Sequence, residues 1–275
     1  MTSILQVGRV QSGGETIYYE WISQGPADDR PVVVLTHGAG GNHAVWFQQV
    51  PALAMSYRVL TWDSRGFGNS TNALDALSPA AAVADLSALL AEVGVGEAEA
   101  VHLVGQSMGG WWVVAFALAQ PRRLRSLTLS DTPGGVMSEA MEQHFGQFLR
   151  RGGMAEAVEL GRHPGIGEGI AATDPALAFL YQELGSFHNP PTGAIGRVLG
   201  TARHDLATVR GLGVPMLVLA GAEDEIFPAA LLADLARDLG ASYVEIPLAG
   251  HSPYFEQAGR YNEAVLNFLS NADRR

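Results

Sequence analysis

The 275-residue sequence predicts an α/β fold built on a mostly parallel, eight-stranded sheet that is flanked by helices. Short runs of apolar, β-branched residues alternate with stretches of helical periodicity, as expected for strands buried on both faces beneath covering helices. Two segments of strand character also surround Gly13-Gly14, which predicts an antiparallel pair before the parallel part begins. One long interval without strand patterning predicts a helical insertion in the sheet.

The expected elements follow in chain order. The antiparallel pair covers 4–10 and 15–24, where aromatic and β-branched side chains favour strand. The later strands are predicted at 32–36, 57–62, 101–104, 124–129, 215–220 and 242–246. The principal helices are predicted at 80–93, 108–119, 228–239 and 254–269. Because parallel strands end at one edge of the sheet, the loops after them are expected to converge there.

The interval from about 132 to 206 has helical patterning and no convincing strand. Apolar side chains in it fall at spacings of three and four, which indicates one face of a helix. These residues are Met137, Met141, Phe145, Phe148 and Leu149. We expect 1–133 and 207–275 to form the core, and 134–206 to form a helical cap. The alternative is two further helices packed on the sheet like the others.

The composition excludes several classes of site. The chain has no cysteine, which excludes disulfides, thiolate metal sites and a cysteine nucleophile. A formal net charge of −11 argues against a basic nucleic-acid surface. The first residues lack a signal-peptide pattern, and no apolar run approaches the roughly 20 residues that span a bilayer. We expect a cytoplasmic protein that binds neither membrane nor nucleic acid.

Ser107 is the strongest candidate for a nucleophile. It lies in Gly105-Gln106-Ser107-Met108-Gly109, between a predicted strand and a predicted helix. Glycine on each side allows a tight reversal of the chain, which exposes the serine at the carboxyl end of the strand. The backbone N–H of Met108, at the start of the helix, can then face a developing oxyanion. This context distinguishes the motif from a structural serine in a glycine-rich turn.

A serine hydroxyl needs a base, and the base needs an acid that orients it. His251 follows the last predicted strand, so it lies on a loop at the same sheet edge as Ser107. The other seven histidines lie in a strand, in the insertion or beside the first glycine-rich loop. Asp224 follows the strand predicted at 215–220 and is the preferred acid. Asp131, which closes the strand at 124–129, is the main alternative.

The loop His37-Gly38-Ala39-Gly40-Gly41 follows the first parallel strand. Its glycines allow the backbone to approach a ligand closely, and the amide of Ala39 is the expected second oxyanion donor. The loop could also be a phosphate-binding turn. However, neither a P-loop nor a dinucleotide fingerprint follows it, so a nucleotide function is not expected.

Together these segments resemble the α/β-hydrolase superfamily over nearly the whole chain. His37-Gly38 resembles its oxyanion loop, and Gly105–Gly109 resembles its nucleophile elbow. The chain order Ser107, Asp224, His251 also matches the family. In the loop 63–70, which resembles the one after the family's next strand, we expect Asp63 and Arg65 to form a structural ion pair. The helical insertion lies where such enzymes have a cap.

The resemblance implies a serine hydrolase that cleaves a carboxylic ester or lactone through an acyl-enzyme intermediate, without a cofactor. Serine at 107 disfavours the dehalogenase and epoxide-hydrolase branches, which use aspartate. The alternatives are a carbon–carbon bond hydrolase of the aromatic-degradation type and a non-catalytic binding member of the fold. A small-molecule substrate with a medium-sized, mainly apolar acyl or alcohol group is expected, and the sequence leaves monomer and homodimer open. Candidate substrate contacts are Gly38, Gly40, Trp112, Met137, Met141 and Phe145.

Overall fold

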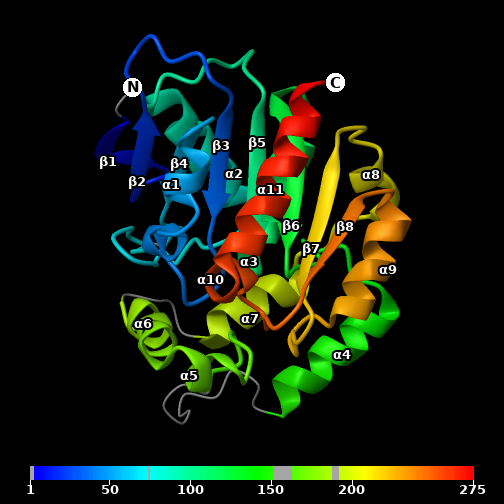
Figure 1. The fold of residues 1–275 in the computed structure, drawn as a ribbon. Coiled ribbons are helices and arrows are strands. Elements are labelled where there is room, and N and C mark those ends of the chain that lie inside the picture. The colour runs from blue at the N-terminus through cyan, green and yellow to red at the C-terminus, as the bar shows by residue number, and fades with distance from the viewer. Residues whose placement is uncertain (1–2, 74, 152–162, 188–191) are drawn as a thin grey trace.

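The computed structural model describes residues 3–73, 75–151, 163–187 and 192–275 of the chain. They form an eight-stranded sheet in the order β1-β2-β4-β3-β5-β6-β7-β8 (Figure 1). β2 pairs antiparallel with β1 and with β4, and the pairs from β4 to β8 are parallel. This confirms the predicted fold class.

The strands are β1 Ile4–Ser12, β2 Glu15–Ser23, β3 Val32–Thr36, β4 Arg58–Trp62, β5 Val101–Gln106, β6 Leu124–Ser130, β7 Met216–Gly221 and β8 Ser242–Ile246. The core helices are α1 Val50–Leu53, α2 Pro79–Glu92, α3 Met108–Ala119, α8 Leu206–Arg210, α9 Ala229–Leu239, α10 Pro253–Glu256 and α11 Ala258–Asp273. Between β6 and β7 the chain also forms α4 Glu139–Arg150, α5 Ile170–Thr173, α6 Pro175–Gly185 and α7 Thr192–Thr201. Two 3₁₀ helices, η1 His43–Trp46 and η2 Pro121–Arg123, complete the described elements.

Two apolar layers enclose the sheet, and β3 contributes to both. Val32 and Val34 pack with α2, α3 and α9, whereas Val33 and Leu35 pack with α1 and α11 on the opposite face. Successive side chains of a strand point to opposite faces, so a strand covered on both sides is apolar throughout. This is the physical reason for the continuous apolar runs in the sequence.

The helices α4 to α7 lie beyond the carboxyl ends of the strands, at the bottom of Figure 1, and not on a face of the sheet. α8 instead packs beside α3 and α9, with Val209 fully buried. The insertion therefore lies at the edge where the loops after β3, β5, β7 and β8 converge. Its treatment as a separate cap of 134–206 remains a prediction. None of the described helices combines the length and apolarity needed to cross a bilayer.

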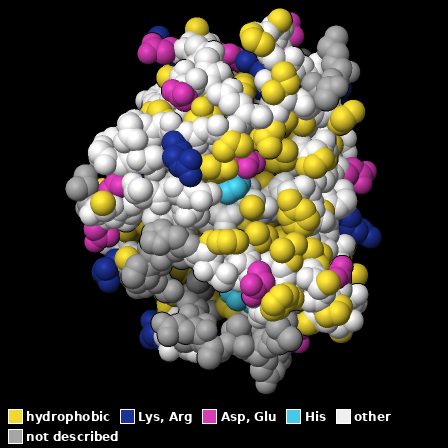
Figure 2. All heavy atoms as spheres, turned by 90° about the vertical axis from the view of Figure 1, so that its left-hand side faces the viewer, with side chains coloured by type: hydrophobic (Ala, Val, Ile, Leu, Met, Phe, Trp, Pro, Cys, Tyr) yellow, Lys and Arg dark blue, Asp and Glu magenta, His cyan; other side chains and the backbone are white. Residues whose placement is uncertain are grey.

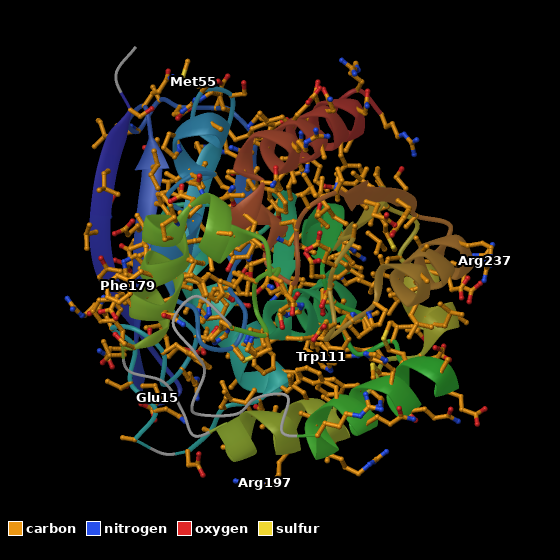
Figure 3. The ribbon with its side chains drawn as sticks, turned by 60° about the horizontal axis from the view of Figure 1, so that its bottom comes forward. Glu15, Met55, Trp111, Phe179, Arg197 and Arg237 are labelled. Atoms are coloured by element: carbon orange, nitrogen blue, oxygen red, sulfur yellow. The ribbon has the colours of Figure 1, made fainter. Side chains whose placement is uncertain are left out.

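The edge strand β1 is the least covered part of the sheet. Its side chains Ile4, Leu5 and Val7 are each more than half exposed. Figure 2 views the side of the molecule on which β1 lies and shows hydrophobic side chains at its surface. In Figure 3, by contrast, Trp111 of α3 lies in the interior, while Arg197 and Arg237 lie at the periphery.

Two local predictions are wrong. The helix expected at 254–269 is two helices, because Gln257 leaves the helical region (φ −130°, ψ 49°) and its side chain donates a hydrogen bond to the carbonyl of Leu248. The expected ion pair between Asp63 and Arg65 is also absent. Arg65 instead pairs with Asp85 at 2.8 Å. Asp63 accepts hydrogen bonds from the backbone of residues 43 and 69 and from the ring of His43.

Candidate active site

Ser107 occupies a strained turn between β5 and α3. Its φ of +49° and ψ of −121° lie in a region that non-glycine residues rarely adopt. A Cβ atom on Gly109 would clash with the backbone oxygen of Thr36, and one on Gly105 would clash with Val113 and with the backbone of Gly109. The two glycines are therefore required by close packing, and this packing maintains the serine conformation.

The loop after β8 places His251 against Asp224. The Nδ1 atom of His251 lies 2.9 Å from Oδ2 of Asp224. The other carboxylate oxygen, Oδ1, accepts hydrogen bonds from the backbone N–H groups of Ile226 and Phe227 at 2.8 and 3.1 Å. Because an ionised carboxylate only accepts hydrogen bonds, Nδ1 is the donor. The Nε2 atom is then the basic nitrogen of the neutral ring.

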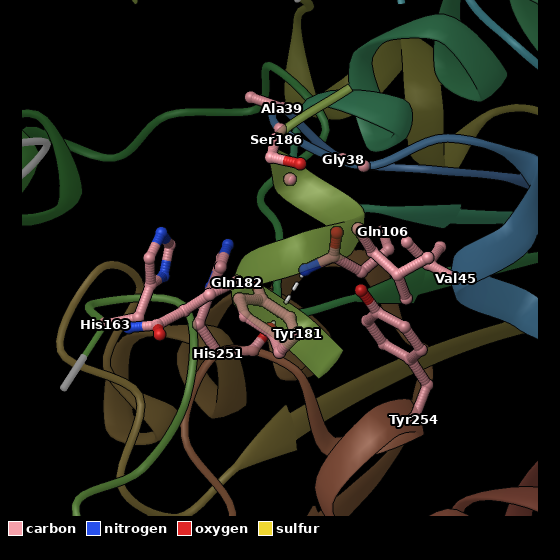
Figure 4. Close-up of a pocket in the computed structure, with 14 residues that line it drawn as sticks. Gly38, Ala39, Val45, Gln106, His163, Tyr181, Gln182, Ser186, His251 and Tyr254 are labelled. Atoms are coloured by element: carbon pink, nitrogen blue, oxygen red, sulfur yellow. Dashed lines mark hydrogen bonds between the residues drawn. The ribbon is translucent and has the colours of Figure 1, made fainter. Parts of the chain in front are cut away.

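Ser107 and His251 line the same cavity. The residue before the nucleophile also links the two loops, because Nε2 of Gln106 donates a hydrogen bond to the backbone oxygen of His251 at 2.9 Å (Figure 4). The elbow after β5 and the loop after β8 are thus joined directly. This contact fixes the position of the imidazole relative to the serine.

Asp131, the alternative acid, bonds elsewhere. Its Oδ1 atom accepts a hydrogen bond from the N–H of Gly221 at 2.7 Å, and its Oδ2 atom lies 2.9 Å from the hydroxyl of Ser130. The side chain is completely buried. Burial, reinforced by the nearby charge of Asp224, raises the pKa of Asp131 well above its ordinary value of 3.8. The geometry therefore favours Asp224 as the partner of the imidazole.

The raised pKa of Asp131 predicts a pH-dependent stability difference. Above pH 3.8 the aspartate of the unfolded chain ionises while that of the folded protein stays protonated. Wild-type protein therefore loses stability as pH rises toward the folded-state pKa, whereas Asp131→Asn lacks this loss. The free energy of unfolding should shift in favour of the variant by about 1.4 kcal/mol per pH unit in that window. Urea unfolding at several pH values measures it, and parallel curves for the two proteins would contradict the assignment.

The loop after β3 presents one amide to the site. The carbonyl of Gly38 accepts hydrogen bonds from Nδ1 of His37 at 2.7 Å and from the N–H of Gly41 at 3.1 Å. His37 donates through Nδ1 because its Nε2 accepts the N–H of Ser64 at 3.0 Å. In a trans peptide the N–H points opposite to the carbonyl. The N–H of Ala39 therefore points away from these partners, and Ala39 lines the cavity of Ser107.

Met108 and Gly38 complete this arrangement. Met108 is the first residue of α3, whose first N–H groups have no partner within the helix. Gly38 approaches the nucleophile so closely that a Cβ atom on it would clash with Oε1 of Gln106 and would lie 2.8 Å from Cβ of Ser107. The structure thus brings together the residues predicted as nucleophile, base, acid and oxyanion donors.

Two compartments meet at these residues. The first, called the polar compartment because it is the more polar of the two, is a cavity of about 390 Å³ with a mixed wall. The backbone of 38–41 and polar side chains such as Gln182 and Ser186 line it together with apolar side chains (Figure 4). The second contains Ser107 and has an apolar wall of Phe145, Leu149, Ile195, Leu199, Ile226 and Phe227. Four residues line both compartments, namely Ala39, His163, Tyr181 and His251. The candidate reacting groups therefore lie at the junction of a compartment with a mixed wall and a compartment with an apolar wall.

The predicted substrate contacts are only partly at this junction. Gly38 and Gly40 line the polar compartment, and Phe145 lines the apolar one. Trp112 lines neither compartment and is completely buried in the hydrophobic core. Met141 is also buried in the core, and Met137 precedes α4 and packs against the same cluster. None of these three side chains lines either compartment, and their contact with substrate remains an untested prediction.

Sequence reasoning missed His163 and Tyr181. They come from the insertion, His163 in a loop and Tyr181 on α6. The helical spacing of apolar residues, which directed attention to α4, gives no information on a polar residue in a loop. The sequence signal that could have indicated His163 is the run His163-Pro164-Gly165, because proline and glycine favour a turn at this histidine.

Comparison with known proteins agrees with the fold. The family described as alpha/beta hydrolase fold matches residues 31–258. A Caulobacter sp. (strain K31) protein named "Putative carbamate hydrolase RutD" is 30% identical over 95% of this chain and 98% of its own. An esterase from Thermogutta terrifontis superposes with a TM-score of 0.78 at 26% identity, covering 97% of this chain and 99% of its own.

The enol-lactonase from Burkholderia xenovorans LB400 has a TM-score of 0.77 at 25% identity, covering 96% of this chain and all of its own. The chain therefore belongs to the α/β hydrolase fold family. It is a hydrolase of that fold, and the names of these three similar proteins indicate different substrates.

Proposed function

We propose that this protein is a serine hydrolase that cleaves a carboxylic ester or lactone through an acyl-enzyme intermediate. The supporting observation is the convergence of Ser107, His251 and Ala39 on one cavity, with His251 bonded to Asp224. Serine, imidazole and carboxylate in this relation are the groups of a nucleophilic triad. The esterase and lactonase likenesses support the same class of reaction.

In the proposed reaction, Nε2 of His251 takes the proton of Ser107 as Oγ attacks the carbonyl carbon. The carbonyl π electrons move to oxygen, and the N–H groups of Ala39 and Met108 stabilise this oxyanion. Asp224 stabilises the imidazolium. Collapse of the tetrahedral intermediate breaks the bond to the leaving oxygen, which takes the proton from His251. In the second half of the reaction, Nε2 of His251 takes a proton from water as the water oxygen attacks the acyl carbon. Collapse of this second tetrahedral intermediate breaks the bond to Oγ of Ser107, which takes the proton from His251, and the acid is released.

The apolar compartment predicts a preference among simple esters. For p-nitrophenyl esters, kcat/KM should rise with acyl length by up to about fourfold per methylene, because each buried CH₂ contributes about 0.8 kcal/mol. The rise should stop when the acyl chain fills the compartment. Phe145 stacks on Phe227 with ring centroids 5.1 Å apart, so Phe145→Ala should extend the space and move the optimum to longer chains.

Initial rates across an ester series measure this preference. Phe179→Ala is the matched control, since Phe179 lies on α6, is half exposed and lines neither compartment. An optimum that does not move in Phe145→Ala would contradict the assignment of the apolar compartment to the acyl chain. Folded protein that hydrolyses no ester would instead favour a lactone or carbon–carbon bond substrate.

A further inference from the structure

His163 lies at the junction of the two compartments. It lines both of them, together with Ala39 and His251. Its ring packs edge-on against Tyr181, with centroids 5.2 Å apart. Figure 4 shows His163, Gln182 and His251 around the polar compartment. This places one polar ring of the insertion next to the residues of the proposed reaction.

The hydrogen bonds of His163 fix its tautomer. Its Nδ1 atom accepts the backbone N–H of Gly165 at 2.9 Å, so a neutral ring has its proton on Nε2. Burial, together with the proximity of His251, lowers the pKa of His163, which favours this neutral form. Within the described part of the chain, no backbone or side-chain group bonds to Nε2. The ring therefore has one hydrogen-bond donor that is available to a ligand.

The neighbouring hydroxyl is already engaged. The hydroxyl of Tyr181 lies 3.0 Å from Oγ of Ser252, on the loop that contains His251. Among the residues shared by both compartments, the side chain of Ala39 is apolar and the imidazole of His251 serves as base. His163 is therefore the shared side chain with a donor that the proposed reaction does not use.

We propose that His163 is a substrate-binding residue whose Nε2–H group donates a hydrogen bond to an oxygen that the substrate has beyond its scissile carbonyl. The inference rests on the proposed ester or lactone hydrolysis. The substrate class is then an ester or lactone with an apolar part and a second oxygen, such as an ether, keto or hydroxyl oxygen, near the reacting bond. The apolar compartment takes the hydrocarbon, and the polar compartment takes the oxygenated part.

The test compares esters that differ only by oxygen in place of CH₂. On the acyl side, p-nitrophenyl methoxyacetate is paired with p-nitrophenyl butyrate. On the alcohol side, methoxyethyl butyrate is paired with butyl butyrate. The quantity is the ratio of kcat/KM for the oxygen-containing ester to that for its carbon analogue. The intrinsic reactivity of each ester cancels when this ratio is compared between wild type and variant.

Two variants distinguish a substrate-binding role of His163 from a structural role of the same side chain. In His163→Asn the amide oxygen can still accept the N–H of Gly165, but no donor reaches the position of Nε2. In His163→Gln the amide nitrogen can reach that position, but the acceptor for Gly165 is lost. His204→Asn is the matched control, because His204 also lies between β6 and β7 but lines neither compartment.

We expect the ratio of at least one pair to fall about three- to tenfold in His163→Asn, the size of one net hydrogen bond. It should remain within about twofold of wild type in His163→Gln and His204→Asn. A ratio unchanged in His163→Asn, or lowered equally in the glutamine variant, would overturn the inference and leave a structural role. Folded wild-type protein that turns over none of the four esters and no lactone would overturn the proposed function, and the inference with it.

Discussion

Replacing Ser107 with alanine is expected to lower kcat by about 10⁵- to 10⁶-fold, the loss seen when a triad serine is removed. The variant has no atom at the position of Oγ, so no acyl-enzyme can form. Alanine adopts the turn with the same φ of +49° as serine, so the fold should remain. Steady-state ester hydrolysis measures the loss, and calorimetric titration with a non-reacting substrate analogue should show that binding remains.

Covalent labelling supplies an independent measurement. A fluorophosphonate should phosphonylate wild-type protein at Ser107 and should not label Ser107→Ala. Ser270→Ala on α11 is the matched control and should label like wild type, because Ser270 lies outside both compartments. Labelling of folded Ser107→Ala, or wild-type rates in that variant, would show that another residue is the nucleophile.

Replacing Asp224 with asparagine is expected to lower kcat by about 10⁴-fold, the loss typical of this change in a triad. Oδ1 would still accept the N–H groups of Ile226 and Phe227, so the amide NH₂ group would face Nδ1 of His251. Nδ1 must then accept, which moves the ring proton to Nε2. A ring protonated at Nε2 cannot take the proton of Ser107.

Asp131→Asn should by contrast keep kcat within about tenfold of wild type. Burial raises the pKa of Asp131, which favours its neutral form, and one of its oxygens accepts from Gly221 while the other lies beside Ser130. Asparagine offers an acceptor and a donor at the same positions. A third variant, Asp238→Asn on the exposed face of α9, is the control for the removal of a carboxylate in the two aspartate variants. If Asp131→Asn destroys activity and Asp224→Asn preserves it, the assignment of the acid is wrong.

The fold was largely predictable because its signals are local. Residues buried between two helical layers are apolar at nearly every position, which is why β3 begins and ends where the sequence predicts. The error over 254–269 has an equally physical origin. Apolar spacing continues past Gln257, but the backbone of Gln257 is not helical, and its side chain contacts the loop before His251. Periodicity does not reveal such a contact.

Side-chain partners were less predictable than elements. Asp63 and Arg65 are close in sequence, and opposite charge alone suggests a pair. In the structure Arg65 reaches Asp85 on α2, while Asp63 binds the loop around His43. Trp112 likewise lies close to the nucleophile in the sequence, but in the structure it is completely buried in the core and lines neither compartment. Proximity along the chain did not determine contact in space.

The sequence by itself determined the sheet, the strand–turn–helix around Ser107 and the order in which the candidate triad residues occur. These features depend on short-range sterics and on strand ends that parallel topology brings to one edge. The sequence already preferred Asp224 to Asp131, but both follow parallel strands, and only the tertiary structure shows that Asp224 bonds to His251 while Asp131 bonds to Gly221. The tertiary structure alone placed His163 beside that pair, because the ring comes from the insertion and meets the site through contacts that are distant in sequence.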